Sequence, residues 1–282
     1  MPNVALVTCY NIPEPDTDET VLVEACRSAG LNVELVPWED EAVDWTRFDL
    51  IVPRSTWNYY EHEAEFRRWI DRASATGRIC NGREILTNNL DKRYLAGLAQ
   101  NSIPIVPTRF LDNACELEEV VLSEGWEAFV VKPAVSAASF MTRRFERHEL
   151  ADAATFADGI LKSRGAMVQR YLPRVADGGE ISLVHIEGEL THGIIKYPRF
   201  EGDVESVSDA VTPTREQAEL AKRIVSTIPT PWLYARVDLM LDDGGSWLLS
   251  ELELIEPSLF LCQSKVALDR LVSAISRFAI AV

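Results

Sequence analysis

The chain has 282 residues, of which 47% are hydrophobic and 26% are charged, and its 28 lysines and arginines against 44 aspartates and glutamates give a formal net charge of −16. This acidic balance argues against nucleic acid or an anionic membrane as the main partner, because both attract basic surfaces. No apolar run approaches the roughly 20 residues of a membrane-spanning helix, and the first residues do not resemble a signal peptide, so a cytoplasmic protein is expected. Five cysteines without a C-x-x-C spacing predict neither a disulfide framework nor a zinc site.

Residues 1–85 alternate between short apolar runs and amphipathic stretches. The apolar runs predict strands at 3–9, 33–36 and 49–52, and helices are predicted at 61–75 and in a segment that ends at Gly30. Strands that alternate with helices through short connections favour a small parallel α/β sheet. Because such sheets bind ligands at the carboxyl ends of their strands, residues 8–11 and 54–60 are candidate binding segments.

After about residue 85 the pattern becomes that of an antiparallel α+β body joined to the first unit. Asn88 and Asn89 predict the start of a helix over 90–100, and strands are expected at 129–131 and from 167 onwards. Turn residues at 187–189 and 242–245 lie between apolar runs, which predicts two hairpins, 181–186 with 190–197 and 232–241 with 247–254. Helices are predicted at 216–228 and 265–281. The apolar stripe of the last helix fits either core packing or a contact between two copies in a homodimer.

The second predicted hairpin carries the strongest cluster of chemistry-bearing residues. Residues two apart in a strand share a face, so Arg236 lies on the same side as Asp238, and Glu251 on the same side as Glu253. If the register brings these faces together, three carboxylates meet beside one guanidinium. Hard oxygen ligands are what Mg²⁺ prefers, usually together with phosphate oxygens. The alternative is a solvated face held by ion pairs.

Three lysines are candidates for binding phosphate. Lys132 ends a strand just before a stretch of small residues at 133–139, where the Ser136 and Ser139 hydroxyls and the backbone can approach a phosphate closely. Lys196 ends a hairpin strand, and Lys92 lies early in the helix predicted over 90–100. The alternative for Lys132 and Lys196 is a lysine stem that lies along apolar surface with its charge in water.

The segment after the third predicted strand is a candidate substrate site. Arg54 can pair with a substrate carboxylate, Ser55, Thr56 and Asn58 can form hydrogen bonds, and Trp57 can supply an aromatic wall with Tyr59 and Tyr60. The alternative is an ordinary turn after a strand, packed by Trp57 and capped by a hydroxyl.

Taken in order, seven short fragments between residues 88 and 262 resemble the ATP-grasp superfamily. They are Asn89-Leu90-Asp91-Lys92, Val130-Val131-Lys132-Pro133, Val168-Gln169-Arg170-Tyr171-Leu172, Glu180, Lys196, Arg236-Val237-Asp238 and Glu251-Leu252-Glu253. The resemblance implies an ATP-grasp fold preceded by a small parallel α/β domain. It divides the chain into a substrate-side domain at 1–85, a lid subdomain at 86–175 and a catalytic subdomain at 176–282.

The resemblance also implies a role for each matching residue, with ATP and Mg²⁺ as the cofactors. Lys92 and Lys132 would contact the ATP phosphates, Glu180 the ribose, and Lys196 would lie near the nucleotide. The adenine hinge would be Gln169, Arg170, Tyr171 and Leu172, and the magnesium ligands Asp238, Glu251 and Glu253. Arg236 would steady an acyl phosphate. Two departures stand out: the usual glycine-rich lid is replaced by residues 135–140, which include no glycine, and the usual Glu-x-Asn metal pair is Glu251-x-Glu253.

Within the superfamily, residues 6–11, 54–59 and 253–258 resemble the O-ureido-D-serine cyclo-ligases and place Ser258 on the substrate side with residues 54–58. That resemblance implies an enzyme of antibiotic biosynthesis with a small amino-acid-like substrate. ATP would phosphorylate the substrate carboxylate, an internal nitrogen would attack it, and the ring of D-cycloserine would close with loss of carbon dioxide and ammonia. Two alternatives remain open: a ligase that joins the carboxylate to a separate amine, as peptide or glutamate ligases do, and a nucleotide-binding regulatory protein without turnover.

Overall fold

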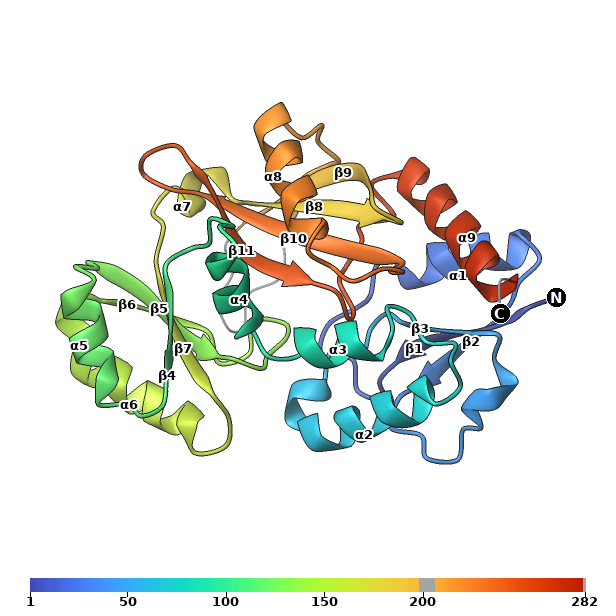
Figure 1. Cartoon of the computed structure of the whole chain (residues 1–282), viewed down its shortest axis with the longest axis horizontal. Helices are drawn as coiled ribbons and strands as arrows, with labels where there is room; N and C mark the ends of the chain where they lie inside the picture. The colour runs from blue at the N-terminus through green and yellow to red at the C-terminus, as the bar shows by residue number, and fades with distance from the viewer. Residues whose placement is uncertain (198–205, 281–282) are drawn as a thin grey trace.

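The computed structural model describes residues 1–197 and 206–280, which form three sheets with helices packed around them (Figure 1). The first is a three-stranded parallel sheet of order β2-β1-β3, built from β1 (Asn3–Thr8), β2 (Asn32–Pro37) and β3 (Leu50–Pro53). α1 (Glu19–Ser28) and α2 (Glu63–Ser74) connect and follow these strands, with short 3₁₀ turns η1 (Trp45–Arg47) and η2 (Tyr59–Glu61). The parallel α/β sheet predicted for residues 1–85 is confirmed.

The second sheet belongs to the lobe at the left of Figure 1 and is antiparallel, of order β4-β7-β5-β6. Its strands are β4 (Thr108–Leu111), β5 (Ala128–Pro133), β6 (Arg143–Glu146) and β7 (Ala166–Arg170). α5 (Glu116–Ser123) and α6 (Leu150–Leu161), the latter after the 3₁₀ turn η3 (Arg147–Glu149), cover its outer face. Leu117, Phe129 and Ile160 are fully buried in the resulting core, which is separate from the rest of the molecule.

The third sheet is also antiparallel, of order β11-β10-β8-β9, and contains both predicted hairpins. Its strands are β8 (Glu180–Ile186), β9 (Glu189–Lys196), β10 (Tyr234–Leu241) and β11 (Trp247–Glu253), preceded by the short α7 (Val175–Gly178). α8 (Arg215–Val225) packs on one face of this sheet. α9 (Lys265–Ile280) packs against α1 in a core shared with β1, so its apolar stripe serves core packing; predicted residue 281 lies outside the described part.

The helix predicted over 90–100 is confirmed in part: α4 (Tyr94–Gln100) ends at the predicted residue but begins four residues late, and a separate helix, α3 (Arg83–Asn89), precedes it. Asn89 does not cap a helix. Its side chain donates to the carbonyl of Leu252 and accepts from the amide of Leu254, both at 2.8 Å, and so fixes the end of β11. Lys92 lies in the turn between the two helices, where its amide donates to the carbonyl of Ala134 (2.9 Å).

No helix in the described ranges is long and apolar enough to cross a membrane.

Candidate active site

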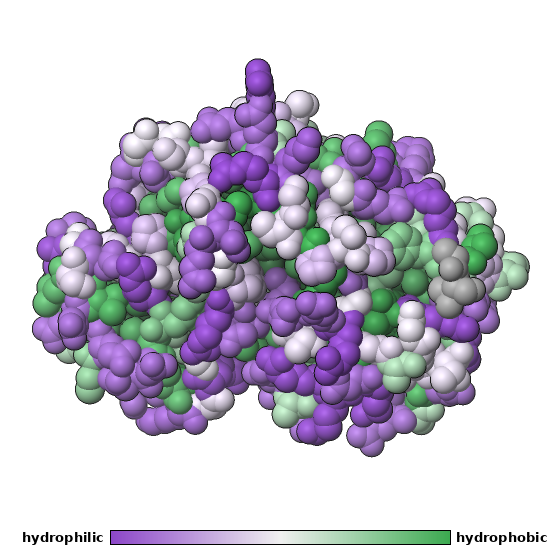
Figure 2. Space-filling model, in the orientation of Figure 1, coloured by the Kyte–Doolittle hydropathy of each residue, from purple (hydrophilic) through white to green (hydrophobic). Residues whose placement is uncertain are grey.

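A cavity of about 260 Å³ lies where the three sheets approach one another, and Figure 2 shows this face hollowed between the lobe of β4–β7 and the rest of the molecule. All three parts of the chain contribute to its walls: η2, the loop at 134–142, and strands of the second and third sheets. Five basic residues line it, Lys92, Lys132, Arg170, Lys196 and Arg236. Five acidic residues also line it, Glu14, Glu180, Glu251, Glu253 and Glu256.

The register of the β10–β11 hairpin places its charged residues opposite one another. Arg236 pairs with Glu253 and Asp238 with Glu251, so the four side chains share the face predicted from the sequence. A β-bulge follows directly, where Leu239 pairs with Leu249 and Ser250 is the extra residue. The Ser250 hydroxyl donates to Glu180 (2.8 Å), which ties the bulge to β8.

Asp238 lies beneath this face, 1% exposed, and is held by two cations. Arg236 donates to it through Nε (2.9 Å) and Nη2 (2.8 Å), and Lys196 Nζ donates to it at 2.7 Å. Burial favours the neutral carboxyl, but the charges of Arg236 and Lys196 outweigh burial and hold the pKa of Asp238 well below its usual range. Asp238 is therefore an ionised carboxylate covered by its partners, and it does not line the cavity.

The two glutamates of β11 have opposite electrostatic environments. Glu251 forms an ion pair with Lys92 (3.0 Å), whose Nζ also donates to the carbonyl of Ser136 (2.8 Å). Burial works against ionisation of Glu251, but Lys92 and Lys132 lower its pKa below the usual value. Glu253 pairs with Arg236, yet burial and the charges of Asp238 and Glu251 raise its pKa to about 7. At this position the negative charge exceeds what the neighbouring cations offset.

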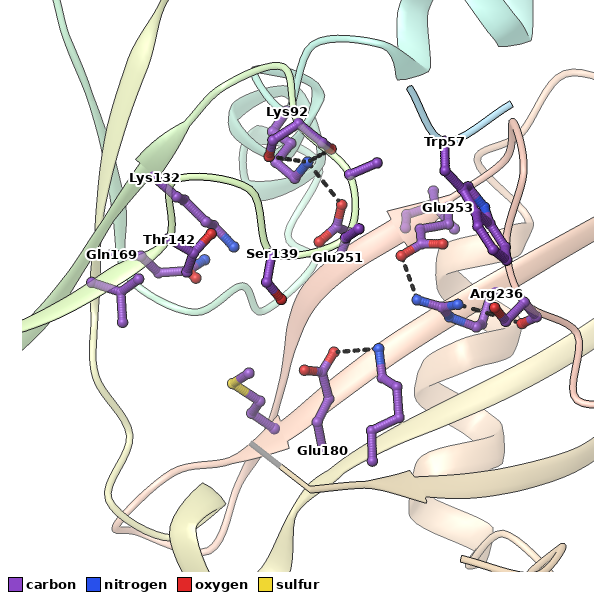
Figure 3. Close-up of a pocket in the computed structure, with 18 of the residues that line it drawn as sticks. Trp57, Lys92, Lys132, Ser139, Thr142, Gln169, Glu180, Arg236, Glu251 and Glu253 are labelled. Atoms are coloured by element: carbon purple, nitrogen blue, oxygen red, sulfur yellow. Dashed lines mark hydrogen bonds and ion pairs between the residues drawn. The ribbon is translucent and has the colours of Figure 1, made fainter. Parts of the chain in front are cut away.

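Lys132 projects from β5 into the same space as Gln169 of β7 (Figure 3). Within residues 1–197 and 206–280 it forms no ion pair and no hydrogen bond through its side chain. Burial lowers its pKa, with Glu251 the largest opposing influence. Lys132 is thus a desolvated cation whose partner is not part of the described protein, which is what a site for an anionic ligand requires.

Glu180 closes the opposite side of the cavity, below Ser139 in Figure 3. Its carboxylate lies 3.6 Å from Lys196 Nζ and accepts from Ser250, while burial raises its pKa. Gln169 Nε2 donates to the Thr108 hydroxyl (2.9 Å), which fixes the start of the segment at 169–172 along the wall.

The donor set fits magnesium in its chemistry. Glu251 and Glu253 present carboxylate oxygens to the cavity beside the buried Asp238, and the raised pKa of Glu253 marks a place where added positive charge is favourable. No group of three acidic, histidine or cysteine side chains is already arranged as a metal site in the described ranges. The carboxylates are instead paired with Lys92, Arg236 and Lys196, so a metal ion would replace these ion pairs.

Most of the predicted site residues meet at the cavity. Those that line it are Trp57, Lys92, Lys132, Ser136, Ser139, Gln169, Arg170, Tyr171, Leu172, Glu180, Lys196, Arg236, Glu251, Glu253 and Ser258. Their location agrees with the sequence-based expectation, whereas their roles stay predictions.

Four predicted substrate residues, Arg54, Ser55, Thr56 and Asn58, are buried behind the wall and do not line the cavity. Arg54 Nη2 donates to the carbonyl of Pro257 (3.0 Å), and its other two guanidinium nitrogens have no hydrogen-bond partner in the described part of the chain. Ser55 donates to Thr8 and Asn58 accepts from Trp38, whereas the buried Thr56 hydroxyl has no hydrogen-bond partner in the described part of the chain. In this geometry the four residues support the wall, because burial keeps them from the cavity.

The sequence-based site lacked two acidic residues that the structure places in the cavity wall, Glu14 and Glu256. Glu14 lies in the loop after β1, and nothing in its proline-flanked context marks it. Glu256 lies in the segment at 253–258 that resembles the cyclo-ligases, but its place outside the alternating pattern of β11 left it without an assigned role.

Comparison with known proteins agrees with this geometry. Residues 4–81 match the family model of the N-terminal domain of D-cycloserine synthetase DcsG. The chain is 32% identical over 292 residues to the cycloserine biosynthesis protein DcsG of Streptomyces lavendulae, covering 97% of each. The crystal structure of D-cycloserine synthetase DcsG superposes with a TM-score of 0.91 at 30% identity, over 98% of this chain and 99% of that one.

More distant structures share the fold. One is the ATP-grasp ligase PsnB complexed with a phosphomimetic variant of its minimal precursor, Mg and ADP. It superposes with a TM-score of 0.67 at 15% identity over 99% of both chains. The ATP-grasp fold expected from the sequence is thereby confirmed.

Proposed function

The chain belongs to the DcsG family of ATP-grasp ligases, and on that basis we propose that it closes the ring of D-cycloserine from O-ureido-D-serine. The substrate carboxylate is first phosphorylated by ATP. The nitrogen next to the side-chain oxygen of the same molecule then attacks the acyl carbon, and phosphate leaves. Loss of the ureido carbonyl as carbon dioxide and ammonia completes the product.

The cavity supplies what such activation needs. A carboxylate resists attack by nucleophiles because of its charge and resonance, so phosphorylation is required to create a leaving group. Lys92 and Lys132 lie where they would neutralise the phosphates, and Arg236 where it would stabilise charge on the acyl phosphate. Asp238, Glu251 and Glu253 would hold Mg²⁺, which offsets the phosphate charge when bound.

Ring closure requires one substrate molecule to be held in a folded conformation and shielded from water. Bringing the nitrogen and the acyl carbon together makes the attack unimolecular, which is worth about 7–11 kcal/mol in favourable geometry. Trp57 and Tyr59 line the cavity near Ser258 and would exclude the water that hydrolyses an acyl phosphate. The observation that supports the proposal most strongly is Lys132, a cation without an ion-pair partner among the described residues. It faces the acidic β11 within a cavity built from all three parts of the chain.

The decisive experiment supplies ATP, Mg²⁺ and O-ureido-D-serine to the purified protein without any separate amine. We expect ADP and D-cycloserine in equal amounts, measured by a coupled ADP assay and by mass spectrometry. ADP formation that begins only when a second amine is added would instead identify an intermolecular ligase.

The matched control for this experiment replaces one arginine at a time. Arg236→Ala should bind nucleotide but form almost no ADP, whereas Arg215→Ala, at an exposed ion pair on α8, should behave as the unmodified protein. Equal activity of the two variants would remove Arg236 from the mechanism.

A further inference from the structure

Glu256 is a cavity-lining carboxylate to which the proposed reaction has so far given no role. It lies just beyond β11, is 8% exposed, and forms no ion pair with a basic residue in the described ranges. Its backbone is fixed from the first domain, because Trp57 Nε1 donates to its carbonyl (2.8 Å) and Arg54 donates to the next carbonyl, that of Pro257. The side chain is therefore presented to the cavity by a rigid support.

The environment of Glu256 differs from that of the β11 acids. Its carboxyl is hydrogen-bonded by the Tyr59 hydroxyl of η2, which also lines the cavity. Glu253 and Glu251 face it from β11, Lys92 from the turn before α4, and the buried Tyr234 from β10. Burial and then the charge of Glu253 raise the pKa of Glu256 to about 8, while Lys92 and the Tyr59 hydroxyl act in the opposite direction.

The position of Glu256 separates it from the groups assigned to phosphate. Lys132 and Gln169 reach the cavity from the lobe of β4–β7, whereas Glu256 shares the opposite wall with Trp57, Tyr59 and Ser258. Arg236 donates to the carbonyl of Ser258, so a substrate whose acyl phosphate contacts Arg236 would lie against this wall. A carboxylate at that wall can accept a proton from nitrogen, which a protonated lysine cannot.

We propose that Glu256 is a catalytic residue, the general base that removes the proton from the substrate nitrogen as it attacks the acyl carbon. The inference rests on the proposed function and deepens it. In this step the C–N bond forms, the C–O bond to phosphate breaks, phosphate leaves with the electron pair, and the N–H proton passes to the Glu256 carboxylate. Tyr59 is a positioning residue, which orients that carboxylate through its hydroxyl.

The test compares Glu256→Gln with Glu61→Gln, an exposed glutamate at the end of η2. Glutamine keeps the shape of Glu256 and can still accept from Tyr59, but it cannot take a proton. We expect nucleotide affinity and a single substrate-dependent turnover of ADP per enzyme to persist in Glu256→Gln, while the steady-state rate of D-cycloserine formation falls by about 10²–10⁴-fold. Glu61→Gln should match the unmodified protein in every measurement.

The outcomes separate this inference from the proposed function. If the unmodified protein forms no D-cycloserine, the proposed function fails. If it does and Glu256→Gln forms D-cycloserine equally well, this inference alone fails. Loss of the single-turnover ADP as well as the product in Glu256→Gln, with a raised KM for the substrate, would show that Glu256 anchors the substrate and would also overturn the inference.

The pH dependence gives a second readout that does not need the glutamine variant to fold. A general base works when deprotonated, so product formation should rise with pH through the pKa of Glu256. Tyr59→Phe removes a donor that lowers this pKa, so the acid limb should move to higher pH by about one unit, the size expected for one hydrogen bond to a charged group. An unmoved limb in Tyr59→Phe would contradict the assignment.

Discussion

At the residue scale, Lys132 shows how a binding site lowers the stability of the protein that carries it. Its pKa is lowered by burial, and no carboxylate in the described ranges pairs with it directly. A desolvated cation without a partner destabilises the folded state, and its removal can raise stability while function is lost.

We therefore predict opposite changes for Lys132→Met. The free energy of unfolding should rise by about 1 kcal/mol, which is roughly 2–4 °C in Tm for a chain of this size, because the buried charge is gone. MgATP should bind about 10–100-fold more weakly, the effect of one lost charge-assisted contact. Thermal unfolding and calorimetric titration measure the two quantities.

The control is Lys162→Met, on an exposed ion pair with Asp158, which should change neither quantity appreciably. A decrease in both Tm and affinity for Lys132→Met would mean that Lys132 supports the fold and not the ligand.

Single residues also show what the sequence could and could not reveal about the site. Arg236, Asp238, Glu251 and Glu253 follow from the two-residue period of strands, and the structure brings them together as expected. Burial depth has no such local signal. Asp238 lies under its partners, and Arg54 lies behind the wall, because contacts with residues more than 40 and 200 positions away hold them there.

At the scale of elements, the segment at 255–261 contributes Ile255, Glu256 and Ser258 to the cavity wall and is held by hydrogen bonds from the first domain and from β10. The buried Asp18 accepts from the amides of Leu259 (2.9 Å) and Leu261 (2.7 Å). This pair of hydrogen bonds supports Phe260, whose φ of 51° lies in the left-handed region that bulky residues rarely adopt. The same segment carries Ser258, whose carbonyl accepts from Arg236.

We predict that Asp18→Asn affects the substrate and not the nucleotide. Asparagine can accept only through one oxygen, so one of the two amides loses its partner and the wall loosens. The KM for the amino-acid substrate should rise about 5–10-fold, and stability should fall by about 1–3 kcal/mol, while MgATP affinity stays the same. Steady-state kinetics with each substrate varied in turn provide the measurement.

Asp71→Asn, at an exposed pair with Arg83, is the control and should leave both KM values unchanged. Equal increases in the two KM values of Asp18→Asn would indicate general loosening of the cavity.

Hairpins and amphipathic helices have strong local signals, so β8–β11 and α2, α8 and α9 agree with expectation apart from their ends, whereas α3, α5, α6 and β6 were not predicted. The helix expected over 90–100 begins only at Tyr94, because the Asn89 side chain bonds to β11 and the Lys92 amide bonds to Ala134. These long-range contacts outweigh a local preference, and they could not be read from the sequence.

At the scale of the whole molecule, the loop at 134–142, between β5 and β6 in the lobe of β4–β7, contacts the first domain. Phe140 of the loop stacks on Tyr60 with ring centroids 4.4 Å apart, and Arg164 lies over the Phe140 ring. The loop has no glycine, yet Ala138, Ser139 and Met141 have positive φ values of 50°, 57° and 47°. This aromatic contact ties the loop that replaces the usual glycine-rich lid to the first domain.

We propose that this lobe moves as a lid on the rest of the chain and that the Phe140–Tyr60 contact holds it closed. Phe140→Ala should then raise the KM for MgATP by about 2–10-fold, the equivalent of one aromatic pair, and speed proteolysis within the loop. A non-hydrolysable ATP analogue should reverse that proteolysis. Leu122→Ala, at an exposed side chain on α5, is the control, and identical cleavage rates with and without the analogue would rule out ligand-dependent closure.

The bulge at Ser250 also constrains which insertions and deletions the β10–β11 hairpin can tolerate. If Ser250 paired with Asp238 in a regular ladder, Glu251 and Glu253 would turn into the apolar core beneath α8, next to Leu239. An insertion between Ser250 and Glu253 would therefore be far more damaging than most substitutions. Removing Ser250 itself would keep both glutamates facing Arg236 and would lose the hydrogen bonds of Ser250 to Glu180 and to the carbonyl of Asp238. Among deletions in β11, this one is therefore expected to be the best tolerated.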